Sequence, residues 1–436
     1  MKKFLQIWFS DFCNIFYHEL HAIIHDSGVM IILIVAGFCY PLLYNYIYSN
    51  GVLNETPVAV VDEADCSDTR RFIREVDATR ELEIAFRCCN MAEAEALMKQ
   101  RKVEGIIYFP ADFGEKIAAM EQATVSIYAN MSSFLYYKNL LIGTEFVMLH
   151  EINQIQFERY AAAGLSEAQA EAMVQAVPYE ENLPYNRTFS YNIFLISGII
   201  FLIIQQVMFI SMSVRFGTEK EENKNGIGTL PENIHGLGIS RVVFSRGAAY
   251  FFIFMIIGVY VTFIVPAVCG FPQRGQFGQI MNLLVLYVLD CVVFSQTWSS
   301  LISRRENVFV MFLFMSPVCL FLTGLSWPTT SFPTFWKGLS YLFPSTFGCQ
   351  AFTNLNTAGA GIESCQLQIQ ALFVQTCIYY FVACLLLYLQ NWFSGWKEKR
   401  MAWLLEKQQK LEAKSSVFAR LHEELEEQHI DEQAGQ

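Results

Sequence analysis

The sequence predicts an α-helical polytopic membrane protein with six transmembrane helices and one α/β extracytoplasmic domain. The chain has 436 residues, of which 53% are hydrophobic and 16% are charged, whereas soluble domains carry about 25% charged residues. The charges are also segregated, since long stretches have almost none and others resemble ordinary soluble protein. Such segregation indicates membrane spans. The net charge of −11 gives no basic surface for nucleic acid, so we expect no nucleic-acid partner.

Six apolar runs are long enough to cross a bilayer, which takes about 20 residues. They lie near residues 29–48, 193–214, 248–268, 280–302, 308–325 and 369–392. No small-residue cleavage site follows the first run, so we interpret it as a retained span rather than a signal peptide. We therefore expect the first transmembrane helix at 27–49 and helices two to six within 191–393.

Basic residues fall on one side of these spans. Five Lys and Arg residues lie in the stretch 215–246, two more in the short loop 303–307, and three at the start of the tail 394–436. Loops rich in Lys and Arg stay in the cytoplasm, whereas long domains are translocated regardless of charge. We therefore expect both termini to be cytoplasmic and residues 50–190 to be extracytoplasmic.

Residues 50–190 have the pattern of a soluble α/β domain. Strand patterns occupy 57–62, 81–86, 103–110 and 123–130, and helical patterns occupy 67–77, 91–100 and, with a break at 162–166, 133–176. This alternation favours a small sheet covered by helices. No glycine-rich phosphate loop or nucleophile elbow occurs there, which favours a structural or partner-binding role. Four cysteines on the predicted outer side could form a disulfide, but their spacing favours no pairing: Cys66, Cys88, Cys89 and Cys365.

Several segments together resemble one transporter family. They are "AVVDEADCSDTRRFIREVDAT", "VEGIIYFPADFGEKI" and "ATVSIYANMSSFLYYKN" before residue 140, "FLTGLSWPTTSFPTFWKGLSYLFPSTFGCQAF" at 321–352, and "EKEENKNGIGTL" at 219–230. They are similar to ABC-2 type permeases of the bacterial multidrug-exporter branch, which have a large extracytoplasmic domain between the first and second spans. The resemblance covers nearly the whole chain. In the family, Gly-Thr follows the acidic stretch closely, whereas here an insertion separates Glu222 from Gly228.

The resemblance implies a dimer of six-span permease subunits with the ABC-2, or type V, exporter fold in the bacterial plasma (inner) membrane. It also implies a separate ATP-binding subunit. It leaves open whether the dimer is a homodimer or a heterodimer, and whether a periplasmic adaptor protein takes part. The chain contains no G-x-x-x-x-G-K-[ST] loop, the motif that cradles nucleotide phosphates. We therefore expect no cofactor and no catalytic residue in this chain, with ATP and Mg²⁺ in the partner.

The stretch 215–246 is the predicted coupling loop to the ATPase. Its site residues by resemblance are Glu221, Glu222, Asn223, Gly228 and Thr229. The alternative is a solvated connector whose charges only set topology.

The segment 1–26 is amphipathic, with aromatic residues at helical spacing, and predicts a helix lying in the membrane interface. In the family this segment helps to hold the ATPase. His18, His21 and His25 share one face of it. They are either polar-face residues near lipid headgroups or a metal or pH site, but we predict no metal because no fourth ligand is evident.

Polar residues inside the spans are further candidates. Asp290 is the only acid within a predicted span, and Gln205 and Gln206 lie in the second span. Buried polar groups of this kind either line a substrate path or join neighbouring helices.

The region 326–350 is too apolar for a free loop and too interrupted for a span. Its predicted gate residues are Gly324, Pro328, Pro333 and Pro344. Re-entrant half-helices fit, because irregular backbone in a membrane must be buried in protein or line a cavity. In the family this region closes the outer end of the pathway, and the alternative is an interfacial aromatic belt.

Transport is the function that these features favour. The expected role is the permease subunit of an ATP-binding cassette exporter, with membrane lipid around it. The competing hypothesis is a membrane-anchored receptor or assembly scaffold that binds partners through residues 50–190. An intramembrane enzyme is disfavoured, because aspartyl chemistry needs two acids that share a proton. The sequence indicates no substrate.

Overall fold

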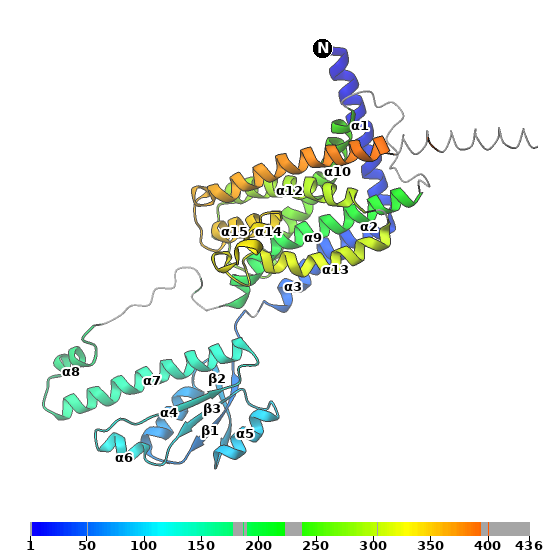
Figure 1. Ribbon diagram of the computed structural model, residues 1–436. Coiled ribbons are helices and arrows are strands. Elements are labelled where there is room, and N and C mark those ends of the chain that lie inside the picture. Colours follow the sequence, from blue (N-terminus) through cyan, green and yellow to red (C-terminus); the bar gives the residue numbers. More distant parts are fainter. Residues whose placement is uncertain are drawn as a thin grey trace, which may run out of the picture. The chain divides into compact units, whose positions relative to one another are not determined.

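The computed structural model describes residues 2–49, 51–177, 190–222, 238–302 and 304–393, together with residues 186 and 400. The chain forms two compact units, Met1–Ser49 with Tyr191–Gln436 and Asn50–Ser190. The first unit is a bundle of helices and the second contains a sheet (Figure 1). The predicted fold class is confirmed, because the chain is mostly helical with one small sheet.

Among the described residues of the first unit, six helices are long and apolar enough to span a membrane. They are Ser27–Ile47, Gly198–Glu222, Gly238–Val268, Phe277–Ser300, Arg305–Leu322 and Ile362–Phe393. All six predicted runs fall within or beside these helices. The bundle is therefore built on the six spans that the hydropathy pattern predicts.

The amino-terminal helix turns into the first span at one capping residue. Helix α1 (Lys2–His25) ends before Asp26, whose carboxylate accepts hydrogen bonds from the backbone N–H groups of Gly28 and Val29. This is an N-cap, which satisfies donors that have no partner within the helix. The first span then comprises α2 (Ser27–Ile31), the π-helix η1 (Ile32–Cys39) and α3 (Tyr40–Ile47).

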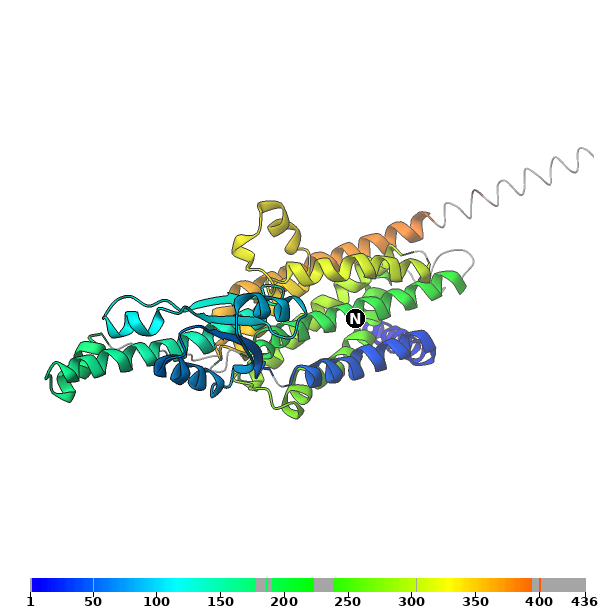
Figure 2. The ribbon, with the colours of Figure 1, turned by 90° about the horizontal axis from the view of Figure 1, so that it is seen from below.

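The remaining helices of the bundle surround α9. Helix α9 comprises Tyr191–Glu222, and the others are α10 (Gly238–Val259), η2 (Tyr260–Ile264), α11 (Val265–Val268), α12 (Phe277–Ser300), α13 (Arg305–Leu322), η3 (Thr329–Ser331), α14 (Thr334–Ser340), α15 (Pro344–Asn356) and η4 (Ile362–Cys365), which begins the last span Ile362–Phe393. Helix α9 packs on α12, α13 and α15 and is the most buried span. Figure 2 shows the stretch after α13, in olive, standing out from the flank of the bundle.

The second unit is a four-stranded sheet in the order β2-β1-β3-β4. Its strands are β1 (Thr56–Asp62), β2 (Leu82–Cys88), β3 (Gly105–Phe109) and β4 (Ser126–Ala129). Strand β1 is parallel to β2 and β3, and β4 is antiparallel to β3. In this register Val58 lies opposite Ile84, and Ile107 lies opposite Ile127.

Helices cover both faces of this sheet. They are α4 (Ser67–Asp77), α5 (Met91–Lys99), α6 (Phe113–Ala118) and α7 (Phe134–Ala162), whereas α8 (Glu167–Val174) packs on α7. Residues of α4 and α7 share one hydrophobic core with Val58, Val60 and Ile107, whereas α5 packs with Ala59 and Val61 on the other face. The strands and longer helices match the predicted ones within a few residues, and only α6 was not predicted.

Candidate functional site

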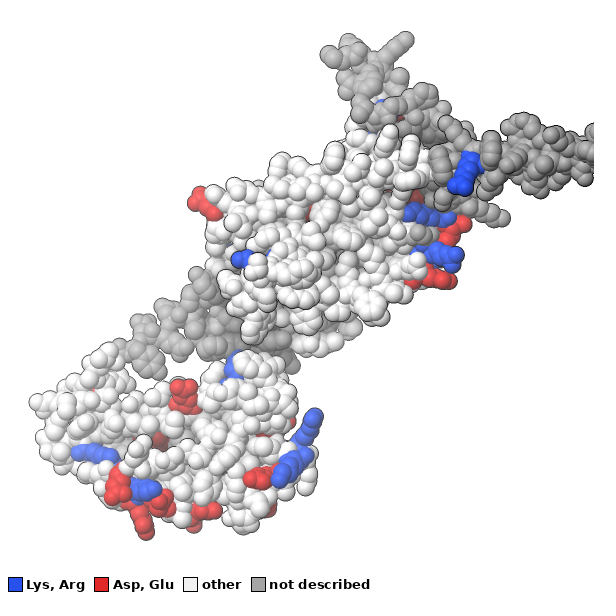
Figure 3. Space-filling view, in the orientation of Figure 1, with Lys and Arg blue, Asp and Glu red and all other residues white. Residues whose placement is uncertain are grey.

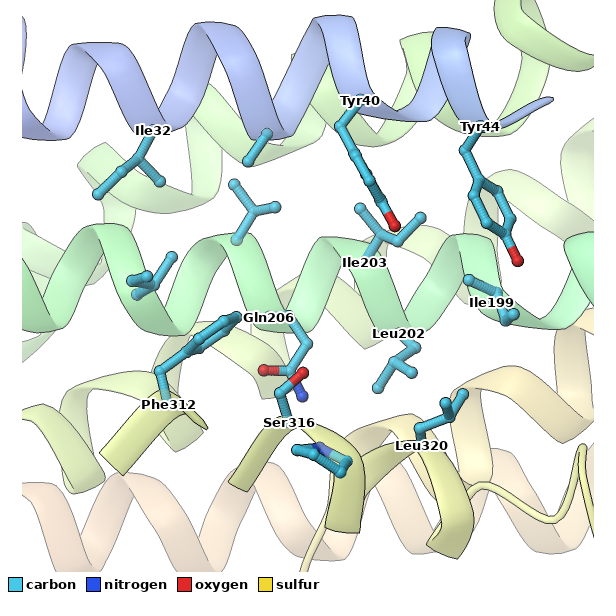
Figure 4. Close-up of a pocket in the computed structure, with 14 residues that line it drawn as sticks. Ile32, Tyr40, Tyr44, Ile199, Leu202, Ile203, Gln206, Phe312, Ser316 and Leu320 are labelled. Atoms are coloured by element: carbon cyan, nitrogen blue, oxygen red, sulfur yellow. The ribbon is translucent and has the colours of Figure 1, made fainter. Parts of the chain in front are cut away.

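A groove of about 590 Å³ lies between the first span, α9 and α13. Its lining residues are Ile32, Ala36, Tyr40, Tyr44, Ile199, Leu202, Ile203, Gln206, Val207, Ile210, Phe312, Ser316, Pro317 and Leu320. Figure 4 shows these side chains converging from the three segments into one space. The lining is apolar except for two tyrosines, one serine and one glutamine, and it contains no Lys, Arg, His, Asp or Glu.

The polar centre of the groove is Gln206. Its side chain is 7% exposed, and neither amide atom has a hydrogen-bond partner among the described residues. Gln206 and Ser316 point toward one another from α9 and α13 (Figure 4), but no hydrogen bond joins them. A buried amide without partners is costly, so this position is an exception to the rule that buried polar groups are paired.

Irregular helix lines the groove on two sides. The π-helix η1 supplies Ile32 and Ala36, and π-helical turns are rare and concentrate at functional sites. On the other side Pro317 lies inside α13, where the missing N–H removes one helical hydrogen bond. Two of the three walls can therefore bend or shift register more easily than a regular helix.

A buried ion cluster lies at the end of the bundle where α9 ends and α10 begins. Arg246 of α10 donates to Glu219 of α9 at 2.6 Å and pairs with Glu19 of α1 at 3.5 Å, and all three side chains are buried. Arg241 and Asp11 form a second ion pair between α10 and α1. The helix predicted to lie in the interface is therefore held to α10 by charge as well as by aromatic contacts.

The last turn of α9 also holds α12 and α13. The Lys220 ammonium donates to the backbone oxygens of Ser300 and Ile302, each at 2.6 Å, which satisfies carbonyls at the end of α12. The backbone N–H of Arg305 donates to the carboxylate of Glu221 at 2.9 Å. We call Glu19, Glu219, Lys220, Glu221 and Arg246 the charged hub, because they connect α9 to four other helices.

The predicted coupling loop is shorter than expected. Helix α9 continues to Glu222 and α10 begins at Gly238, because several charges of the predicted loop are paired against neighbouring helices instead of being solvated. Glu221 belongs to the charged hub, and Glu222 is exposed at the end of α9. Asn223, Gly228 and Thr229 lie outside the described residues.

Sequence reasoning placed the charges at the end of α9 in the coupling stretch but missed Glu19 and the pairing within the charged hub. Glu19 and Arg246 lie more than 200 residues apart in the chain, and neither belongs to a recognisable motif. The available signal was local, namely an arginine directly before the apolar run of α10. Figure 3 shows coloured charged side chains gathered over the ends of α9 and α13, whereas the visible flank of the bundle is nearly white.

The predicted gate residues shape the turns between α13 and α15. Gly324 follows α13 with a φ of +83°, a conformation that favours glycine. Pro328 precedes η3, Pro333 precedes α14, and Pro344 is the first residue of α15. These positions are consistent with two short helices, and their role as a gate stays a prediction.

The other predicted residues have separate surroundings. The Gln205 oxygen accepts a hydrogen bond of 2.6 Å from the Ser345 backbone N–H, so it joins α9 to α15. Asp290 of α12 is fully buried and lies outside the groove lining, and Thr376 of the last span is beside its carboxylate. The rings of His21 and His25 stack with centroids 3.8 Å apart.

Neither metal sites nor disulfides are formed by the candidate residues. In the described ranges, no group of three His, Cys, Asp or Glu side chains is placed to hold a metal ion. All twelve cysteines, including Cys66, Cys88, Cys89 and Cys365, are free thiols.

Comparison with known proteins identifies the family of this chain. The family described as ABC-2 family transporter protein matches residues 28–393, a range that begins one residue into the first long helix and includes the other five and the whole groove. No curated protein matches the chain. Because the family match covers well over half of the sequence, the chain belongs to the ABC-2 family of transporter proteins.

Proposed function

We propose that this chain is the permease subunit of an ATP-driven exporter and that the groove is where substrate enters its path. One observation supports this most directly. Helix α9 lines the groove with Ile199, Gln206 and Ile210, and the same helix ends in the charged hub just before residues 223–237 of the predicted coupling stretch. A single helix thus connects a candidate ATPase contact with a candidate substrate site.

We expect the charged hub to transmit a displacement of residues 223–237 to the helices of the bundle. Lys220 and Glu221 fix the end of α9 to α12 and α13, and Glu219 fixes it through Arg246 to α10 and α1. Packed helices move as rigid bodies between discrete arrangements. A displacement of residues 223–237 therefore moves α9 and α13 together, and these two helices form two walls of the groove.

The proposed assembly follows from the family and from charge placement. The charged hub end faces the cytoplasm of a bacterial cell under the positive-inside rule, and residues 50–190 face outward. A separate subunit binds ATP and Mg²⁺ at the cytoplasmic end. A second permease subunit completes the transporter.

The test is reconstitution of the chain with its ATP-binding subunit in proteoliposomes. Arg246→Leu breaks the connection among α1, α9 and α10, so we expect ATP-dependent export to fall at least tenfold while the complex still assembles and hydrolyses ATP. Arg304→Gln is the matched control, because this exposed arginine lies at the same end outside the charged hub. If no ATP-binding subunit copurifies with the wild-type chain, the proposal fails and the receptor or scaffold hypothesis replaces it.

A further inference from the structure

The unpaired amide of Gln206 requires an explanation, because burial removes water without supplying a partner. Its nitrogen and oxygen are both buried, and neither makes a hydrogen bond of normal geometry with the described residues. The thiol of Cys319 lies beside it, but thiols are weak hydrogen-bonding groups. Gln205, one residue earlier, shows that this helix can satisfy a buried amide through a backbone N–H. Gln206 thus lines the groove without a strong partner, and a change of its side-chain rotamer would turn the amide toward a ligand.

The lining restricts what can bind this amide. It contains no Lys, Arg, His, Asp or Glu, and a charge without a counter-charge is costly to move into apolar surroundings. The volume of about 590 Å³ lies within the range of about 300 to 1,000 Å³ for small-molecule sites. An uncharged molecule with a long apolar part and one hydrogen-bonding group fits both restrictions.

We propose that the groove binds an uncharged amphiphile, whose single polar group exchanges hydrogen bonds with the Gln206 amide while its apolar chain lies against α9, α13 and the first span. This inference rests on the proposed function and adds the class of substrate. Ser316 faces the same point from α13 (Figure 4), so the polar group is held between two helices. Tyr40 and Tyr44 extend the site along the first span.

A second copy of the chain is a weaker occupant. A helix with its side chains is about 10 Å in diameter, so only a side chain inserted from it could reach an amide that is 7% exposed. A single alkyl chain with a small polar head is narrow enough to enter the groove beside it. The geometry therefore favours a slender ligand.

The test uses tritiated twelve-carbon probes with the purified chain in nanodiscs, without any ATP-binding subunit. The probes are dodecanamide, dodecanoate and dodecyltrimethylammonium, which share a chain and differ in the charge of the head. We expect saturable dodecanamide binding at least tenfold tighter than binding of either ion. Gln206→Met should weaken dodecanamide binding about tenfold, the factor for one lost buried hydrogen bond.

Gln375→Met is the matched control. Gln375 is also 7% exposed, but it lies on the last span outside the groove, so its replacement should leave dodecanamide affinity unchanged. Equal affinity for all three heads, or an unchanged affinity in Gln206→Met, overturns the proposal. Absence of binding together with a dimer that Gln206→Trp dissociates also overturns it, and identifies the groove as a subunit interface.

These outcomes are separable from the proposed function. The probe assay contains no ATPase, so a failure to bind the probes leaves ATP-driven export of another class of substrate standing. Conversely, failure of an ATP-binding subunit to copurify leaves a positive binding result intact and removes only its assignment to transport.

Discussion

Two neighbouring glutamines show that the surroundings of a residue determine its role. Gln205 and Gln206 are adjacent in sequence and both are buried, but successive residues of a helix point about 100° apart because a turn takes 3.6 residues. Gln205 therefore meets α15, whereas Gln206 faces the groove. The sequence predicted that both are buried polar residues in a span, but it could not assign interhelical bonding to one and the groove to the other.

This difference predicts opposite effects on stability. Gln205→Leu removes the acceptor of the Ser345 N–H and leaves a buried donor unpaired, so it should lower stability by about 1–3 kcal/mol. Gln206→Leu removes an amide that already lacks partners, so the melting temperature should not fall. Thermal unfolding of the two purified variants in detergent measures this contrast. A lower melting temperature for Gln206→Leu than for Gln205→Leu would contradict these assignments.

Two helical glycines in the region after α13 provide a second contrast. A Cβ added at Gly348 of α15 would overlap the ring of Tyr287 on α12, whereas a Cβ at Gly338 of α14 meets nothing within 4 Å. Overpacking costs about 1–3 kcal/mol. Gly348→Ala should therefore lower the melting temperature and the yield of folded protein. Gly338→Ala should be neutral or slightly stabilising, and equal losses in both variants would refute the close α12–α15 packing.

At the scale of elements, the sequence predicted what depends on local periodicity. The strands of the second unit were predicted closely, because β1 and β3 are short apolar runs that end at acidic residues or proline. The end of α9 and the start of α10 were placed wrongly. The charged residues there were interpreted as part of a solvated loop. Only the folded chain shows that Glu219 and Arg246 neutralise each other. No sequence pattern predicted the π-helix η1.

The attachment of α7 to the sheet unit gives a prediction at this scale. Arg71 of α4 binds Glu151 of α7 with two nitrogens at 2.6–3.0 Å, and this carboxylate raises the pKa of Arg71. Glu151 is almost fully buried. Glu151→Gln removes the buried partner of the guanidinium and leaves only the more distant Asp68 paired with it, at 3.7 Å, so it should lower the free energy of unfolding of this unit by about 2 kcal/mol.

Urea unfolding of the full-length protein, followed by proteolysis within 51–177, measures this loss. Glu95→Gln is the control, because Glu95 pairs with Lys99 on the exposed side of one helix and exposed pairs contribute little. If both variants unfold at the same urea concentration, the Arg71–Glu151 pair does not hold α7 in place.

At the scale of the whole molecule, both candidate sites combine segments that are distant in the chain. The groove joins residues near 36, 206 and 316, and the charged hub joins residues near 19, 219 and 246. Hydropathy predicted the helices that carry these residues, because the apolar length of a span is a local property. Which faces of those helices meet is decided by tertiary packing, which one sequence without motifs at these positions does not reveal.

The orientation of the whole chain is the remaining prediction, and two native cysteines test it. Cys13 on α1 and Cys89 after β2 are both exposed, and they lie on opposite sides of the first span in sequence. The positive-inside rule places Cys13 in the cytoplasm and Cys89 outside. In spheroplasts, a membrane-impermeant maleimide should label a variant that retains only Cys89, and should label the Cys13 variant only after permeabilisation. Because both thiols are accessible in the folded chain, a difference in labelling reports sidedness rather than burial. The reverse pattern would place the charged hub outside the cell, where no ATP is available to drive it, and would remove the basis for the proposed exporter.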